Sequence, residues 1–423
     1  MLPIHDTAAR LNAAVGSSRE PVRYRRDFIL LWSGGLISWI GNWMLVIALP
    51  TAVYHLTGSA LATGTMFIAQ TLPSVLVGLF AGVWVDRWDR KRVMVVSDAL
   101  RTVVFLPILL VHTQSAVWVI YASVLAEATV AQFFNPAQVA LLPCVVGEEG
   151  LLAANARVAW GSQFALLVGP AFGGILYGFY GFPTVLLLDG ASFLVSGVLI
   201  ALVQTDGAPS LPSRHRASEA SAPAVHPNSR RELIAGLRLV ARTRGVRGLF
   251  IVTGLLWCAL GLYYALFVIW VTTVLHAGAV AYGWLLTATA VGGFGGSLLL
   301  ARLGRALPRH LLLAVSGIAT GLAFLAVIDI PVFPVDLVLR ALGDAPAAIF
   351  FIGLQTAMQQ AVADAYRGRV FGTLGATNGL MMLGGMSIAS LGGDHLGVVP
   401  LLNLAGGLYL AAGTAAFFLL REA

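Results

Sequence analysis

Long apolar stretches, separated by short polar intervals, repeat along nearly the whole chain. Each holds about 20 residues, the length that an α-helix needs to cross the hydrocarbon core of a membrane. The pattern predicts twelve such helices in two sets of six. The first set lies near residues 28–50, 61–85, 93–112, 116–140, 158–180 and 183–204, and the second near 250–274, 281–301, 311–330, 335–358, 371–393 and 399–420.

The polar intervals divide the chain into two membrane halves. Several prolines among Ser, Ala and Arg between 205 and 229 predict a linker that cannot bury enough apolar surface to fold alone. Residues 230–242 place apolar and basic side chains on different faces, which predicts a helix along the membrane surface, with a partner-binding helix as the alternative. The predicted parts are an N-terminal tail (1–27), a first half (28–204), a linker (205–249), a second half (250–420) and a C-terminal tail (421–423).

Composition and charge agree with a membrane protein. Of the 423 residues, 58% are hydrophobic and only 11% are charged, too few to coat soluble domains of that size. The net charge of +7 comes from Arg and Lys in the first tail, the loop after the second span and the linker. By the positive-inside rule these segments and both termini are cytoplasmic. No nucleic-acid-binding motif surrounds the charges, so no nucleic-acid partner is expected.

Several kinds of chemistry lack matching residues. Cys144 is near the cytoplasmic end of the membrane and Cys258 is inside the seventh span, so no disulfide is expected. No His or Cys spacing predicts a metal site. The single lysine, Lys91, stands in Arg-Lys-Arg and not in a phosphate-binding loop. Without a nucleophile motif or a His–acid pair at membrane depth, the chain is predicted not to be an enzyme and to need no cofactor.

The two halves share an acidic segment. Residues 127–138 and 344–355 align without a gap, and each begins with an acid inside an apolar stretch, Glu127 in one half and Asp344 in the other. Many secondary transporters are duplicated proteins with a site near the membrane midplane, because rocking one half against the other exposes the site to each side in turn. The sequence therefore predicts a transporter.

Glu127 and Asp344 are predicted to lie near the midplane, where an unpaired charge costs several kcal/mol. Each is a candidate proton acceptor, since desolvation favours the neutral form of a carboxyl group. For Asp344 a structural ion pair with Arg340, one helical turn away, is an equal alternative. Ser123 stands at the matching position before Glu127, so Glu127 has no cation on its own helix and is the favoured proton acceptor.

A loop motif follows the second span. Residues 82–92 read Gly-Val-Trp-Val-Asp-Arg-Trp-Asp-Arg-Lys-Arg, and residues 297–305 form a degenerate copy with Ala301 at the first acid. The motif resembles the signature loop of the major facilitator superfamily, with Asp89 at its second glycine. The resemblance implies that Asp86 and Arg87 latch the cytoplasmic ends of the halves together in the outward-facing state.

Two further charged residues, Asp98 and Arg101, lie in the third span. They are three residues apart, so they are expected to pair with each other or to contact the loop. The residues assigned to gating are Gly82, Asp86, Arg87, Arg90, Lys91, Asp98 and Arg101.

The fifth span contains a cluster of small residues. Close helix packing alone explains it. It also resembles the Gly-Pro-x-x-Gly-Gly core of the antiporter motif in drug-exporting members of the superfamily, with Ala165 where that motif has a further glycine. The residues are Gly169, Pro170, Gly173 and Gly174.

Together with residues 90–101, 135–143 and 367–371, these motifs resemble the macrolide and siderophore exporter branch of the drug:proton antiporters. The resemblance implies an all-α membrane protein with twelve transmembrane helices in two pseudo-symmetric halves, placed in a bacterial cytoplasmic (inner) membrane. It implies a secondary transporter that exports a drug-like, macrolide-like or siderophore-like molecule in exchange for protons. Dedicated metabolite uptake and a non-transporting membrane sensor remain alternatives.

The expected partners are membrane lipids, a small amphiphilic organic substrate and protons, for a chain that acts as a monomer. Proton antiporters of this superfamily commonly carry an arginine in the fourth span. Here that span has none, and the arginine occurs instead as Arg340 in the other half. The polar and aromatic residues expected to face the cargo are Asn42, Trp43, Gln132, Gln163, Tyr263, Tyr264, Asn378 and Met381.

Overall fold

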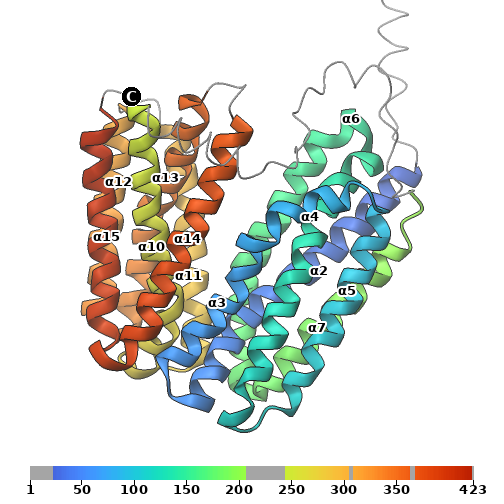
Figure 1. Ribbon diagram of the computed structural model, residues 1–423, viewed down its shortest axis with the longest axis horizontal. Coiled ribbons are helices and arrows are strands. Elements are labelled where there is room, and N and C mark those ends of the chain that lie inside the picture. Colours follow the sequence, from blue (N-terminus) through green and yellow to red (C-terminus); the bar gives the residue numbers. More distant parts are fainter. Residues whose placement is uncertain (1–21, 206–242, 304–307, 363–366, 422–423) are drawn as a thin grey trace, which may run out of the picture.

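The computed structural model describes residues 22–205, 243–303, 308–362 and 367–421. Within these ranges the chain forms helices and no strands, arranged as two bundles side by side (Figure 1). The first bundle, the N half, contains α2 (Val22–Thr57), α3 (Ala60–Leu76), α4 (Gly78–Val85), α5 (Arg90–Phe105), α6 (Val117–Tyr180) and α7 (Phe182–Ala201). The second, the C half, contains α10 (Arg244–Thr273), α11 (Ala279–Leu303), α12 (Arg309–Asp329), α13 (Phe333–Ala361), α14 (Arg367–Leu396) and α15 (Val398–Leu419).

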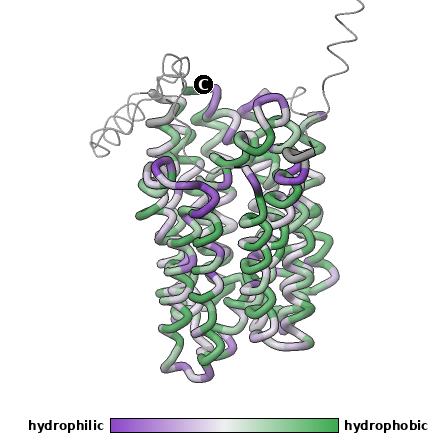
Figure 2. The backbone as a smooth tube through the Cα atoms, turned by 90° about the vertical axis from the view of Figure 1, so that its right-hand side faces the viewer, coloured by the Kyte–Doolittle hydropathy of each residue, from purple (hydrophilic) through white to green (hydrophobic). Residues whose placement is uncertain are grey.

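The prediction of twelve membrane-spanning helices is confirmed for the described residues. Ten helical segments are long and apolar enough to cross a membrane, and one of them, Gln114–Tyr180, contains two of the predicted spans. It is broken at Gly147, whose φ of 69° is a left-handed conformation that glycine adopts at little cost. α3 and α4 together supply the remaining span. Figure 2 shows hydrophobic residues along most of each helix and hydrophilic stretches mainly at the ends.

The predicted surface helix at 230–242 and most of the predicted tail and linker lie outside the described residues. Their boundaries therefore stay predictions.

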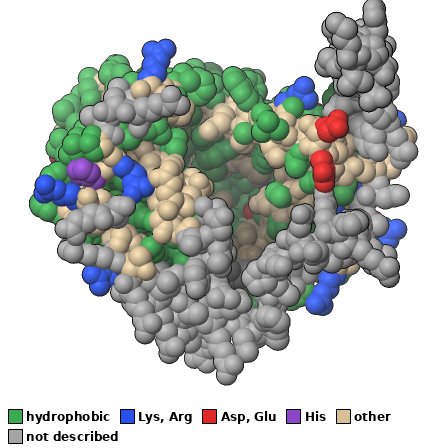
Figure 3. All heavy atoms as spheres, turned by 90° about the horizontal axis from the view of Figure 1, so that it is seen from above, with side chains coloured by type: hydrophobic (Ala, Val, Ile, Leu, Met, Phe, Trp, Pro, Cys, Tyr) green, Lys and Arg blue, Asp and Glu red, His purple; other side chains and the backbone are tan. Residues whose placement is uncertain are grey.

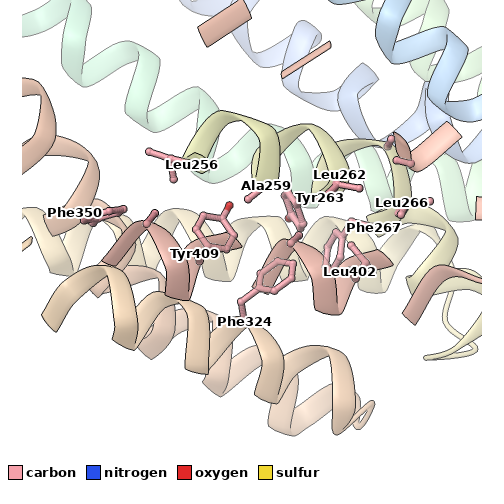
Figure 4. Packing of buried hydrophobic residues seen from close by; sticks show 14 of the residues in the cluster. Leu256, Ala259, Leu262, Tyr263, Leu266, Phe267, Phe324, Phe350, Leu402 and Tyr409 are labelled. Atoms are coloured by element: carbon pink, nitrogen blue, oxygen red, sulfur yellow. The ribbon is translucent and has the colours of Figure 1, made fainter. Parts of the chain in front are cut away.

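Aromatic side chains fill much of the core of the C half. The α10 residues Tyr263 and Phe267 pack against Phe324 of α12 and near Tyr409 of α15 (Figure 4). The ring centroids of Tyr263 and Phe267 are 4.7 Å apart, and those of Phe324 and Tyr409 are 5.5 Å apart. Such contacts add to the free energy gained by burying the rings, and they fix the position of α10 between its neighbours.

The two halves touch at one end and separate toward the other. At the end that carries Asp394, here called the closed end, α14 contacts α3. Toward the middle of the bundle α11 contacts α6, where Thr287 donates a hydrogen bond to the Leu167 carbonyl (3.0 Å). The opposite end, which carries the C terminus and Arg247, is here called the open end. Seen from this end, a hollow lies between the halves (Figure 3).

Candidate functional site

Glu127 forms an ion pair with Arg101 in the N half. Glu127 Oε1 accepts hydrogen bonds from Arg101 Nε at 2.8 Å and Nη2 at 2.6 Å. Arg101 Nη2 also donates to Asn42 Oδ1 at 3.3 Å. The three residues come from α6, α5 and α2. Glu127 has no cation on its own helix, as predicted, but Arg101 of the neighbouring helix α5 supplies one.

The structure separates Arg101 from the gating loop to which it was assigned. Its side chain is only 6% exposed and lies 3.9 Å from Asp98, which is fully buried. The predicted pair with Asp98 is thus present, but the two short charge-assisted bonds to Glu127 are the stronger contact. The guanidinium also lies 4.0 Å from the centroid of the Phe193 ring, a cation–π contact. Arg101 belongs to a buried charge cluster within the membrane.

A third acid, Asp189 on α7, completes this cluster and was not predicted from the sequence. It is fully buried, its Oδ2 has no hydrogen-bond partner, and it interacts electrostatically with Arg101 and Glu127. The available signal was a lone acid inside the sixth predicted span. The cluster thus holds three carboxyl groups, those of Asp98, Glu127 and Asp189, and the single cation of Arg101. Its charges balance when two of the three carboxyl groups carry a proton.

The cluster lies in the wall of a cavity of about 330 Å³, here called the N-half cavity. Arg101, Glu127 and the predicted cargo residues Asn42 and Gln132 line it, beside apolar residues such as Phe67. A lining that combines polar and apolar side chains suits an amphiphilic molecule.

A second buried arginine lies in the C half. Arg340 Nη1 is 3.9 Å from Asp344 Oδ2, so the ion pair considered from the sequence is present. The Arg340 guanidinium lies over the rings of Phe267 (4.3 Å) and Tyr263 (5.0 Å). Asp336, one turn earlier on α13, is fully buried, and neither of its carboxyl oxygens has a hydrogen-bond partner. Asp336 was not predicted from the sequence as a functional residue.

Arg340 and Asp344 line a cavity of about 460 Å³, here called the C-half cavity. Tyr263, Tyr264 and the α6 residue Gln163 also line it. Because α6 belongs to the N half, this cavity lies between the halves. Of the eight predicted cargo residues, five line one of these two cavities and Trp43, Asn378 and Met381 line neither.

The predicted gating loop ties helices of the N half together at the open end. Asp89, which replaces a glycine of the superfamily signature, caps α5 by accepting a hydrogen bond from the Arg92 amide (2.9 Å). Arg90 donates to the Ala140 carbonyl at 3.3 Å, and Lys91 donates to the Val203 carbonyl at 2.6 Å. The proposed latching by Asp86 and Arg87 stays a prediction.

The glycine cluster of the fifth span packs against two helices. Gly173 lies against the backbone of Met44 on α2, whereas Gly174 lies against Ala279 on α11 of the other half. Gly283 of α11 in turn lies against the Pro170 carbonyl. A Cβ at any of these glycines would overlap backbone atoms, so small residues are required for the observed approach.

Gly173→Ala is expected to lower the free energy of unfolding by about 1–3 kcal/mol, because its Cβ would overlap the Met44 backbone. The measurement is denaturation of purified protein in mixed micelles. Gly384→Ala is the matched control, since a Cβ there meets nothing within 4 Å. Equal destabilisation by both substitutions would contradict the packing role of Gly173.

Residues 17–422 match the family of transmembrane secretion effectors. The chain belongs to this family of major facilitator transporters. It is 30% identical to the "Multidrug efflux pump Tap" of Mycolicibacterium fortuitum, over 93% of this chain and 92% of that protein. It is 25% identical to "Macrolide efflux protein A" of Streptococcus pyogenes, over 92% of this chain and 94% of that protein.

The fold of this secretion-effector family member also matches solved transporter structures. A bacterial homologue of the iron transporter ferroportin, in an inward-facing state, superposes with a TM-score of 0.73 at 16% identity, covering 94% of this chain and 99% of that one. The nucleoside transporter NupG (D323A mutant) gives a TM-score of 0.72 at 11% identity, covering 93% and 100%. The predicted superfamily and the predicted class, a multi-pass membrane transporter of the efflux type, are confirmed.

Proposed function

We propose that the chain exports drug-like amphiphilic molecules across a bacterial cytoplasmic membrane in exchange for protons. The observation that carries the proposal is the Arg101–Glu127 ion pair in the wall of a cavity between membrane helices. A buried carboxylate with one cationic partner can exist charged or protonated, as an exchanger requires. The multidrug and macrolide efflux functions named for the two relatives support a drug as cargo.

The open end is proposed to face the cytoplasm. Arg90, Lys91 and Arg92 begin α5 there, and Arg247 is near the beginning of α10 at the same end. Basic residues concentrate on the cytoplasmic side of membrane proteins. The described conformation then exposes its hollow to the cytoplasm, from which an exporter collects cargo.

Proton exchange is proposed to work through the contact between Glu127 and Arg101. In the described conformation both hydrogen bonds that Arg101 donates to Glu127 go to the same carboxylate oxygen, Oε1. A proton on Glu127 would remove the negative charge that holds Arg101, and Asp98, already 3.9 Å away, offers that cation a second partner. The two charge arrangements would favour different relative positions of the halves, which couples protonation to alternating access.

The cargo is proposed to bind between the halves, in the C-half cavity and the adjoining hollow. This cavity combines aromatic side chains, Tyr263 and Phe324 among them, with the charges of Arg340 and Asp344. Such a surface suits a molecule with an apolar body and a few polar groups. Since one chain supplies both halves, a monomer contains the whole proposed site.

The test is growth of an efflux-deficient bacterial host in ethidium, erythromycin or a siderophore, at matched expression of wild type, empty vector and variants. Wild type is expected to protect against at least one compound. If cells with the empty vector grow as well as wild-type cells in every compound, drug export is contradicted. A dedicated metabolite carrier or a sensor is then favoured.

Asp344→Asn is expected to weaken protection against cationic ethidium by about threefold to tenfold while retaining part of the activity. Its carboxylate provides the negative charge in the C-half cavity, and removing one charge partner costs roughly 1 kcal/mol or more. The inhibitory concentration of ethidium, compared with that of uncharged probes, measures the effect. An unchanged inhibitory concentration would remove Asp344 from cargo recognition.

A further inference from the structure

Asp394 of the C half is hydrogen-bonded to the first residues of α3 in the N half. Its Oδ2 accepts from the Ser59 hydroxyl at 2.8 Å and from the Leu61 amide at 3.3 Å. Its Oδ1 accepts from the Ala60 amide at 2.7 Å. Three donors of one half thus converge on a single carboxylate of the other half.

The donors are the groups that a helix leaves without partners at its beginning. The first N–H groups of a helix have no acceptor within the helix, and the helix dipole places partial positive charge there. Ser59 caps α3 from its own half by accepting from the Ala62 amide (3.3 Å). The amides of Ala60 and Leu61, which precede Ala62, donate their hydrogen bonds to Asp394 of the other half. Asp394 also places a full negative charge at this end of the helix.

Small residues let the two helices come close enough for this contact. A Cβ at Gly393, next to Asp394, would overlap the Ala60 side chain. One turn further along α3, a Cβ at Gly64 would overlap Ser390 of α14. Close approach of α3 and α14 and capture of the carboxylate therefore occur in the same place, at the closed end.

We propose that Asp394 is a latch that holds the closed end shut, with the beginning of α3 as its receptor. When the halves separate at this end, Asp394 and the α3 amides must exchange their mutual bonds for bonds to water. The latch therefore favours the described conformation over one that opens at the Asp394 end. This role does not depend on the identity of the cargo or of the coupling ion.

The contact is partly exposed to solvent, so its bonds are screened and their effect on the equilibrium is moderate. Two conformers are compared, one in which the halves are separated at the Asp394 end and one in which they touch there. Asp394→Asn is expected to raise the ratio of the separated to the touching conformer about threefold to tenfold. Asparagine has a similar shape but carries no charge, and it presents one oxygen where aspartate presents two.

The measurement is the distance between spin labels on Ser115 and Val332, by double electron–electron resonance in nanodiscs. These exposed residues are in different halves at the closed end, and neither contributes an atom to the hydrogen bonds of Asp394. Cys144 and Cys258 are first replaced by serine. The wild type is expected to give mainly the shorter distance, and Asp394→Asn is expected to add a longer-distance population.

Asp329→Asn is the matched control. Asp329 is also an exposed acid at the closed end of the C half, but it accepts its hydrogen bond from Asn403 Nδ2 (2.9 Å) within the same half. Its substitution should leave the distance distribution unchanged. An Asp394→Asn distribution equal to that of the wild type, or matched by Asp329→Asn, would overturn the latch.

Ser59→Ala provides a second route to the same conclusion. It removes the hydroxyl donor and should shift the distribution in the same direction, by less than Asp394→Asn. If the two residues act as one latch, adding Ser59→Ala to Asp394→Asn should change little further, because the acceptor is already weakened. Independent, additive shifts would show that Ser59 acts only as the cap of α3, and they would overturn the proposed contact.

Discussion

Glu127→Gln is expected to reduce gradient-driven export to the level of cells that lack the protein. Glutamine nearly matches glutamate in shape and can still accept a hydrogen bond from Arg101, but it cannot take up and release a proton at physiological pH. The proposed switching of Arg101 between partners then stops. The measurement is the rate of ethidium efflux from energised cells, with the amount of protein in the membrane determined in parallel.

Glu149→Gln is the matched control for this result. Glu149 is an exposed acid on the same helix, near the break at Gly147, and its substitution should leave efflux unchanged. Full efflux by Glu127→Gln at wild-type abundance would remove Glu127 from the mechanism.

Arg101→Gln is expected to lower the free energy of unfolding by about 3–5 kcal/mol, because it leaves buried acids without their cation. Glu127 would lose two short hydrogen bonds, and Asp98 and Asp189 would lose their nearby positive charge. Denaturation of the purified protein in mixed micelles measures the loss. Arg101→Lys should recover part of it, since lysine keeps the charge but not the two-nitrogen contact.

Arg92→Gln controls for the loss of an arginine on α5. The Arg92 side chain is 86% exposed, so a change within about 0.5 kcal/mol is expected. Combining Arg101→Gln with Glu127→Gln should be less destabilising than the sum of the single substitutions, because neither charge is then left alone. Strict additivity would contradict the coupling seen in the structure.

The architecture could be predicted from sequence because membrane helices are recognisable as long apolar stretches. Each must satisfy its backbone internally and present about 20 apolar residues to lipid, and the polar intervals mark their ends. The residues at which the helices break were not predicted from the sequence. The break between α3 and α4 at Val77 interrupts a stretch that reads as one continuous apolar span.

The buried acids were predicted only in part, because Asp189 and Asp336 were missed, and the pairing of Glu127 with Arg101 was not predicted. Glu127 and Asp344 stand out because charges are rare inside apolar spans. Pairing between helices depends on how each helix is rotated about its own axis. In a segment that is apolar on all sides, the pattern of apolar residues does not determine this rotation. A signal for the Arg101–Glu127 pair was present. Arg101 lies about eleven residues before the end of the predicted span 93–112, and Glu127 about eleven after the start of the next, 116–140, so adjacent antiparallel helices place them at similar depth.

Contacts between the halves were the least accessible to sequence reasoning. Asp394 falls near the end of a predicted span, where an acid is unremarkable. Its role depends on the relative position of two bundles that are far apart in the sequence. Only the assembled structure brings its carboxylate to the beginning of α3.

The most direct test of proton-coupled export is proton movement driven by cargo in inside-out membrane vesicles with an imposed pH gradient, the interior acidic. With wild-type protein, adding ethidium is expected to dissipate the gradient, reported by a pH-sensitive dye, whereas Glu127→Gln vesicles should keep it. Ethidium uptake by wild-type vesicles without any loss of the gradient would contradict proton exchange, as would equal dissipation by Glu127→Gln.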